Sequence, residues 1–221
     1  MALAKDISPR LYLIAPQNPD MEIFLPLLDQ VCAAADIASL LLPLPSGDFR
    51  SRINFIKSVI PVTQRYDIAV VVTSDDDDDE LVRTALRGGA DGIHLDGNHQ
   101  KLKDFREELG TEYILGAGGV ITRDDAMLAG EKGADYIWFG NRKETDELSS
   151  LTQRKDNVSW WAEIFEPPCV TYARTWDEVD IIAGAKAEFV AAGNLIWNDT
   201  EGAAAAIVKM NDILRKYSVA E

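Results

Sequence analysis

The chain has 221 residues, of which 47% are apolar and 27% are charged, the balance of a globular protein with a large core. Its formal net charge of −15 argues against nucleic-acid binding, because contacts to the phosphate backbone depend on clustered Lys and Arg. The longest apolar run, Ile37–Leu44, is too short to cross a membrane, and residues 1–10 lack the pattern of a signal peptide. Cys32 and Cys169 are the two cysteines, both within apolar segments, so we expect a cytoplasmic protein.

Short apolar runs alternate with amphipathic segments along the chain. The apolar runs predict strands at 11–15, 37–42, 68–73, 92–95, 113–116, 136–140, 169–173 and 189–193. The amphipathic segments predict helices at 20–34, 49–65, 78–88, 99–109, 123–132, 157–165, 175–183 and 201–217. Strict alternation favours parallel strands joined by right-handed crossovers. We therefore predict an α/β fold, a single (β/α)8 TIM barrel over residues 1–221, with an open doubly wound sheet as the alternative.

A short motif recurs before three of the predicted strands. Gly89-Ala90-Asp91 precedes the fourth, Gly133-Ala134-Asp135 the sixth, and the weaker copy Ala187-Glu188 the eighth. We interpret the glycine or small residue as a left-handed helix end and the acid as the residue that opens the next strand. The motif supports the barrel and carries no information about chemistry.

The loops that follow the strands form the catalytic face of a barrel, so polar residues there are the first candidates for a site. Asp75, which opens an acidic run over residues 75–80, and Asp96 after the fourth predicted strand offer oxygen ligands for Mg²⁺. The acidic run has an alternative interpretation as a solvated loop before a helix. His94 and His99, the two histidines, suit proton transfer; alternatively, His94 is an interior residue and Asp96 belongs to a turn.

A glycine-rich segment follows the fifth predicted strand. Gly118 and Gly119 would let the backbone approach a ligand closely. Thr122 and Asp125 behind them have the spacing of a helix cap. The chain shows no arrangement typical of a Ser/His/Asp triad, a cysteine nucleophile or a zinc site, and its predicted strands contain no Lys for a Schiff base.

The last three strand exits supply candidates for binding small phosphorylated substrates. Asn141 and Arg142 follow the sixth predicted strand and open a predicted polar loop over 141–158, where they either hold an anion or face solvent. Arg174 follows the seventh strand, and Gly193 and Asn194 follow the eighth. These two loops commonly hold a phosphate in barrels, so Arg174 and the backbone at Gly193 and Asn194 form the predicted phosphate clamp.

Three segments carry a family resemblance. Leu11–Ile14, Gly89–Leu95 and Gly133–Gly140 are similar to the thiamine-phosphate synthase family, which includes thiamine-phosphate pyrophosphorylase and a thiazole tautomerase. Their order and spacing match over nearly the whole chain. The resemblance implies a barrel that joins a pyrimidine pyrophosphate to a thiazole phosphate with release of pyrophosphate, using Mg²⁺ and largely positional catalysis. Barrels of this kind often pair, so a homodimer is expected.

Several motif residues of that family are replaced. Leu41–Pro45 stands where the family has a Gln-Leu-Arg-x-Lys motif whose cations bind pyrophosphate. Gly118 stands where synthases have Ser, Val120 where the tautomerase has His, and Tyr172–Arg174 where a Gly-Gly pair is expected. The expected metal-binding Asp falls near His99, with Asp96 as its substitute.

These replacements leave three interpretations of function. The first is a thiamine-phosphate synthase-like enzyme. The second is a non-catalytic relative that binds a phosphorylated ligand or a partner in a regulatory role. The third is a barrel isomerase that uses His94, Asp96 and Arg174.

Overall fold

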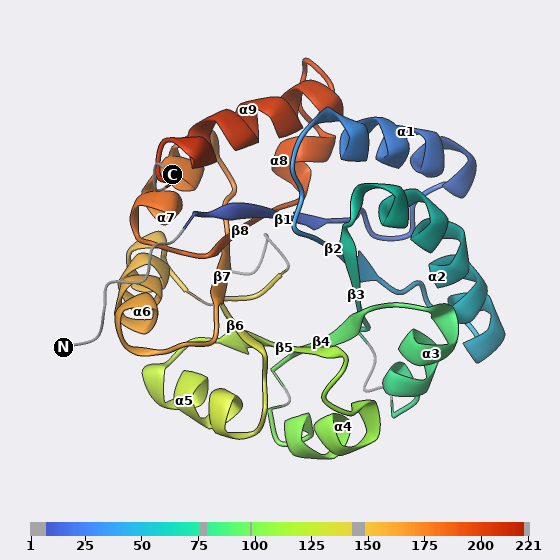
Figure 1. Cartoon of the computed structure of the whole chain (residues 1–221), viewed down its shortest axis with the longest axis horizontal. Helices are drawn as coiled ribbons and strands as arrows, with labels where there is room; N and C mark the ends of the chain where they lie inside the picture. Colours follow the sequence, from blue (N-terminus) through green and yellow to red (C-terminus); the bar gives the residue numbers. More distant parts are fainter. Residues whose placement is uncertain (1–7, 76–78, 98, 143–148, 219–221) are drawn as a thin grey trace.

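Eight parallel strands close into a barrel in chain order, with β8 returning to pair with β1 (Figure 1). The structure, a computed structural model, describes residues 8–75, 79–97, 99–142 and 149–218. The predicted (β/α)8 barrel is confirmed, and the open-sheet alternative is wrong. The strands are β1 (Arg10–Ile14), β2 (Ser39–Pro43), β3 (Ala69–Thr73), β4 (Gly92–Asp96), β5 (Ile114–Val120), β6 (Tyr136–Phe139), β7 (Cys169–Tyr172) and β8 (Phe189–Ala192).

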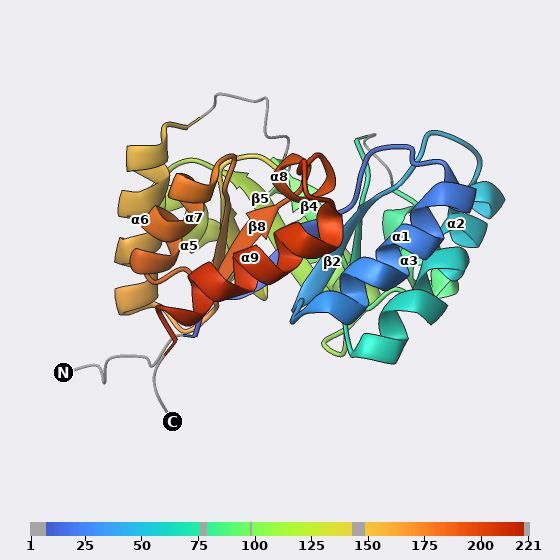
Figure 2. The ribbon, with the colours of Figure 1, turned by 90° about the horizontal axis from the view of Figure 1, so that it is seen from above.

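Helices surround the barrel as an outer ring (Figures 1 and 2). They cover the outer face of the sheet, which explains why the strands are apolar almost throughout. Among the described residues, no helix is both long and apolar enough to span a membrane. The ring consists of α1 (Met21–Ala34), α2 (Phe49–Thr63), α3 (Leu81–Gly88), α4 (Leu102–Leu109), α5 (Arg123–Glu131), α6 (Leu151–Ile164), α7 (Trp176–Gly184) and α9 (Ala203–Arg215), with a 3₁₀ turn η1 (Gln64–Tyr66) and a short helix α8 (Asn194–Trp197).

The recurring motif before β4, β6 and β8 ties neighbouring strands together. Gly89 and Gly133 have positive φ angles of 83° and 92°, as expected for left-handed helix ends. The acid of each copy accepts an N–H from the start of the preceding strand: Asp91 from Val70 at 2.7 Å, Asp135 from Leu115 at 2.7 Å and Glu188 from Cys169 at 2.9 Å. We call Asp91, Asp135 and Glu188 the entry carboxylates. They satisfy backbone donors at the amino-terminal rim of the barrel.

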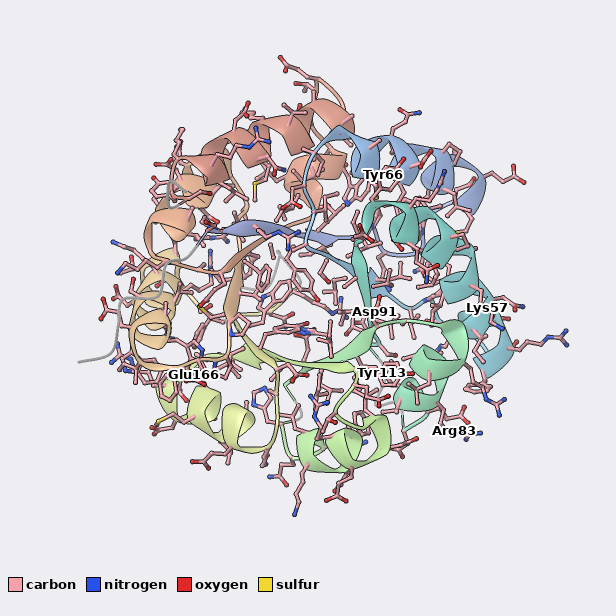
Figure 3. All side chains as sticks on the ribbon, viewed as in Figure 1. Lys57, Tyr66, Arg83, Asp91, Tyr113 and Glu166 are labelled. Carbon is pink, nitrogen blue, oxygen red and sulfur yellow. The ribbon has the colours of Figure 1, made fainter. Side chains whose placement is uncertain are left out.

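Side chains fill the interior of the barrel, so it is a packed core and not a pore (Figure 3). A separate, larger apolar layer lies between the strands and the helix ring. The buried residues of the inner cluster are Tyr12, Ile14, Leu41, Val71, Tyr136, Trp138, Val170, Tyr172 and Ala191.

Two boundaries differ from the sequence predictions in ways that affect the site. Helix α6 begins at Leu151, with Ser150 as its cap, so the predicted loop over 141–158 ends before residue 151. Strand β5 continues to Val120, so the glycine-rich segment belongs to the strand and not to a loop. The cap at Thr122 is confirmed, because its hydroxyl oxygen accepts the N–H of Asp125 at 3.1 Å.

Candidate functional site

Polar side chains from four strand exits and from helices α6 and α7 form two charged clusters at the carboxyl-terminal face of the barrel. This face carries the short helix α8 and lies uppermost in Figure 2. We call Asp75, Asp96 and Arg142, which follow or end β3, β4 and β6, the Arg142 cluster. We call Arg154 of α6, Arg174 after β7 and Glu178 of α7 the Glu178 cluster.

In the Arg142 cluster, one guanidinium is shared by two carboxylates. Arg142 Nε lies 2.7 Å from Asp96 Oδ2, and Arg142 Nη2 donates to Asp75 Oδ1. The first contact is an ion pair without the alignment of a hydrogen bond, so neither atom has a hydrogen-bond partner among the described residues. The side chain of Arg142 is only 5% exposed and that of Asp96 18% exposed, whereas that of Asp75 is 40% exposed.

A chain of hydrogen bonds continues from Asp96 into the barrel. His94 is fully buried, with Nε2 3.3 Å from Asp96 Oδ1 and Nδ1 2.8 Å from the Tyr136 hydroxyl. The Tyr136 and Tyr12 hydroxyls are 2.9 Å apart. With a neutral imidazole, Nε2 donates to the carboxylate, and each tyrosine donates toward Nδ1 along the chain. Both ring nitrogens of His94 are therefore satisfied, the geometry expected of an interior histidine.

Burial alone would raise the pKa of Asp96. The neighbouring His94 and Arg142 outweigh that desolvation and hold the pKa of Asp96 below its ordinary value. Asp96 is therefore a carboxylate at neutral pH, as its ion pair with Arg142 requires.

The predicted ligand-contact glycines of β5 pack against this cluster. A Cβ at Gly118 would lie 2.3 Å from His94 Nε2 and 2.4 Å from Asp96 Oδ1, so only glycine fits there. Gly119 has a φ of 68° and donates its N–H to the Gly140 carbonyl at 2.9 Å. The close backbone approach predicted at these glycines is made by the protein's own side chains and strands, and a ligand contact there stays a prediction.

The geometry tests whether Asp75 and Asp96 fit the Mg²⁺ that the family resemblance implies. Both carboxylates already face the Arg142 guanidinium. No group of three or more His, Cys, Asp or Glu side chains in the described part of the chain is arranged to hold a metal. As arranged, the site does not fit a divalent cation. Residues 76–78 of the acidic run lie outside the described residues, and Asp79 pairs with Lys101 at 2.7 Å.

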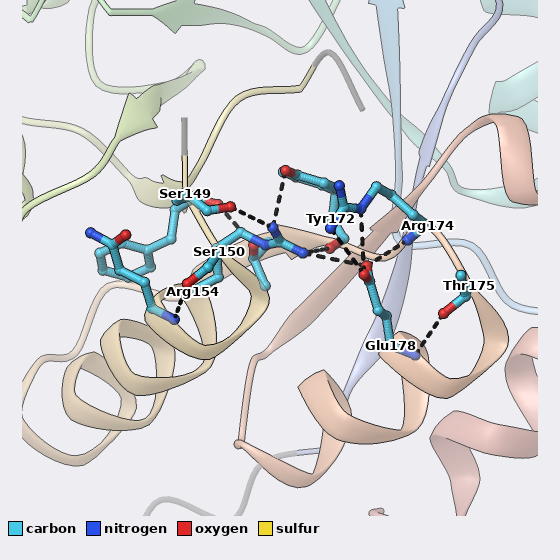
Figure 4. Close-up of polar contacts among 10 residues, drawn as sticks. Ser149, Ser150, Arg154, Tyr172, Arg174, Thr175 and Glu178 are labelled. Carbon is cyan, nitrogen blue, oxygen red and sulfur yellow. Dashed lines mark hydrogen bonds and ion pairs between the residues drawn. The ribbon is translucent and has the colours of Figure 1, made fainter. Parts of the chain in front are cut away.

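In the Glu178 cluster, two guanidinium groups share one carboxylate (Figure 4). Glu178 Oε2 accepts from Arg154 Nη2 at 3.3 Å and from the Arg174 backbone N–H at 2.9 Å. Its Oε1 accepts from Arg174 Nη2 at 3.2 Å. Arg154 is fully buried and also donates to the Tyr172 hydroxyl at 3.0 Å, whereas the Arg174 side chain is 36% exposed.

The predicted phosphate clamp comes from neighbouring strand exits. Gly193 directly follows β8 and precedes α8, and Asn194 is the first residue of that helix. The carbonyl of Gly193 accepts the backbone N–H of Trp197 at 3.0 Å. Because β7 and β8 are paired, Arg174 and these two residues belong to adjacent loops. Phosphate binding at this place stays a prediction.

Two further candidates lie apart from the barrel interior. His99 hydrogen-bonds through Nε2 to the Gly118 carbonyl at 2.7 Å and lines a surface cavity of about 480 Å³ with Lys132, the residue after α5. His94, in contrast, is fully buried inside the barrel. Asn141, the residue before Arg142 at the exit of β6, is half-buried.

Sequence reasoning missed Glu178 and Arg154. Thr175 and Glu178 have the Thr-x-x-Glu spacing of a helix cap, and Thr175 does cap α7 by accepting the Glu178 N–H at 3.2 Å. That spacing indicates a helix start, but it does not identify Glu178 as the partner of Arg174. Arg154 gave no signal, because it fell within the predicted loop.

The fold and these clusters define a (β/α)8-barrel protein with charged side chains gathered at the face where such barrels carry their sites. The family model described as thiamine monophosphate synthase matches residues 11–196. The chain therefore belongs to the thiamine monophosphate synthase family.

Similar proteins agree with this assignment. The chain is 31% identical to a thiamine-phosphate synthase of Rhodospirillum centenum over 93% of this chain and 98% of the relative. It is 32% identical to that of Hyphomonas neptunium over 95% of each. A thiamine phosphate pyrophosphorylase structure from Pyrococcus furiosus superposes with a TM-score of 0.77 at 20% identity, over 96% of this chain and 98% of that one, which shows the shared fold.

Proposed function

We propose that the protein is a thiamine-phosphate synthase that joins a pyrimidine pyrophosphate to a thiazole phosphate with release of pyrophosphate. The observation that carries the proposal is the family match from β1 to α8, with curated synthases similar over nearly the whole chain. The reaction needs little covalent participation by the protein: the reactants must be held in line and the departing anion stabilised.

The Glu178 cluster supports an anion subsite at the exits of β7 and β8. Two arginines share one carboxylate, so these three side chains together carry an excess of positive charge. Buried Arg154 and Glu178 fix the position of the half-exposed Arg174. In the proposed reaction Arg174 and the backbone at Gly193 and Asn194 hold a phosphate group of a substrate.

The proposal is tested by incubating the purified protein with both precursors and measuring thiamine phosphate and pyrophosphate. We expect Arg174→Gln to lower kcat/KM by at least about tenfold, because a charge-assisted contact to phosphate is lost. Arg215→Gln removes the same charge from an exposed pair at the end of α9 and should leave kcat/KM unchanged. Formation of thiamine phosphate no faster than in the protein-free mixture would contradict the proposal.

A second candidate is a relative that binds a phosphorylated ligand without turnover. The engagement of Asp75 and Asp96 by Arg142 favours it, since the family reaction is expected to use Mg²⁺. A rise in thermal stability with a precursor, without product formation, would support this candidate. No rise with either precursor would exclude its ligand-binding form.

The predictions of a cytoplasmic location and a homodimer belong to the same proposal. Cys32 and Cys169 are both buried thiols, which agrees with a reducing compartment. Light scattering of the purified protein would measure its mass in solution and test the dimer.

A further inference from the structure

The Arg142 cluster lies outside the proposed anion subsite, and its buried guanidinium is shared by two carboxylates. We propose that the guanidinium of Arg142 is the resident cation of this site, standing where a divalent metal would bridge Asp75 and Asp96 and competing with it. The inference does not depend on the transfer reaction, because it concerns only which cation the two carboxylates bind.

The geometry leaves no separate place for a metal between these carboxylates. Asp96 Oδ2 faces Arg142 Nε at 2.7 Å, while Asp96 Oδ1 faces His94 Nε2 at 3.3 Å. Asp75 Oδ1 accepts from Nη2 of the same guanidinium. Since Mg²⁺ requires oxygen ligands at about 2.0–2.1 Å, the two carboxylates can bind the ion together only after they release the guanidinium.

Releasing the guanidinium is unfavourable at this depth. The Arg142 side chain is 5% exposed, and arginine cannot lose its charge to ease its burial. A metal that displaced it would leave a buried cation without a partner, which costs far more than breaking a surface pair. The short connection through Gly140 and Asn141 also holds Arg142 close to the exit of β6.

The test is a titration with Mn²⁺, which takes the same oxygen ligands as Mg²⁺ and is counted directly by electron paramagnetic resonance. We expect the native protein to bind Mn²⁺ weakly and Arg142→Gln to bind it at least about tenfold more tightly, because the competing charge is gone. Adding Asp96→Asn to Arg142→Gln should remove the gain. Arg215→Gln, which loses an exposed guanidinium paired with Asp212, controls for the overall change in charge.

Two outcomes would overturn the proposal. One is a folded Arg142→Gln variant, verified by near-ultraviolet circular dichroism, whose affinity for Mn²⁺ equals that of the native protein. The other is tight Mn²⁺ binding by the native protein that Asp75→Asn weakens. The comparison of the native protein with Asp75→Asn needs no Arg142 variant, so it tests the proposal even if Arg142→Gln does not fold.

A consequence for anion binding, which rests on the proposed function, is tested separately. Pyrophosphate should raise the thermal midpoint of the native protein in the presence of EDTA, since no divalent metal is needed. If pyrophosphate binds only with added metal, the resident-cation proposal fails. If it binds under neither condition, the anion subsite of the proposed function fails, while the Mn²⁺ comparison still tests Arg142.

Discussion

Replacing Glu178 with Gln removes the carboxylate that two arginines share while keeping the size of the side chain. Arg154 Nη2 lies 3.3 Å and Arg174 Nη2 3.2 Å from its oxygens, and Glu178 is buried. At these distances and an effective dielectric constant of about 20, each attraction is about 5 kcal/mol before the cost of desolvation is subtracted.

Measured losses on breaking a buried pair by removing one partner are about 3–5 kcal/mol. Because Gln still accepts hydrogen bonds, we expect Glu178→Gln to lower the free energy of unfolding by about 3 kcal/mol, the smaller of these values. Arg154 would then remain as a buried cation beside Arg174 without a compensating charge.

Urea denaturation measures this change, and it avoids the ionic screening that guanidinium chloride would introduce. The matched control is Asp212→Asn, which breaks the Arg215–Asp212 pair, whose side chains are 68% and 64% exposed. The control should change the free energy of unfolding by less than about 1 kcal/mol. If Glu178→Gln cost no more than this control, the Glu178 cluster would not be the buried electrostatic support described above.

Three further predictions concern other parts of the barrel. Gly118→Ala should lower the free energy of unfolding by about 1–3 kcal/mol, because the new Cβ would meet His94 and Asp96 within 2.4 Å, whereas Gly130→Ala, with its nearest contact at 3.6 Å, should not destabilise. The depressed pKa of Asp96 adds to the free energy of unfolding; this contribution is complete above pH 3.8, the ordinary pKa, and disappears as pH falls through the lower pKa of the folded protein. Asp96→Asn should therefore reduce the loss of unfolding free energy at acid pH. An unchanged acid dependence would contradict the depressed pKa of Asp96. Burial raises the pKa of Cys32 to about 12, so iodoacetamide should label that thiol at neutral pH only after unfolding, as read by mass spectrometry; labelling of the native protein would be inconsistent with it.

The sequence predicted the barrel well because its signals are local. Each strand is a short apolar run, and Gly89 and Gly133 mark helix ends through a positive φ angle that glycine adopts readily. The order of elements then leaves few topologies, since parallel strands need right-handed crossovers.

Helix α6 shows where such reasoning fails. Its first two turns read Leu-Thr-Gln-Arg-Lys-Asp-Asn, and two of its inward positions are occupied by Arg154 and Asn157. Hydrophobic periodicity cannot identify helical turns whose buried positions are polar. The burial of Arg154 depends on hydrogen bonds to Glu178 and Tyr172, which are distant in sequence, as well as to the nearby Ser149 carbonyl.

The sequence predicted which residues lie at the candidate site but not which of them contact one another. Asp75, Asp96 and Arg142 were each selected because they follow a strand, and the structure brings all three together. Their pairing depends on loops up to 67 residues apart in the chain, and no local pattern encodes it. The sequence therefore suggested two metal ligands and an anion-binding arginine, but it did not predict that these three side chains pair with one another.

The entry carboxylates bear on how such a protein can diverge. Asp91, Asp135 and Glu188 fix neighbouring strands from the amino-terminal rim, opposite the face that carries the two charged clusters. Substitutions in the loops of the opposite face therefore leave these three attachments intact. A lineage can exchange the residues that meet substrate one at a time while strand register is inherited unchanged. Grafting the strand-exit loops of an active relative onto this scaffold is, for the same reason, a realistic route to altering its chemistry.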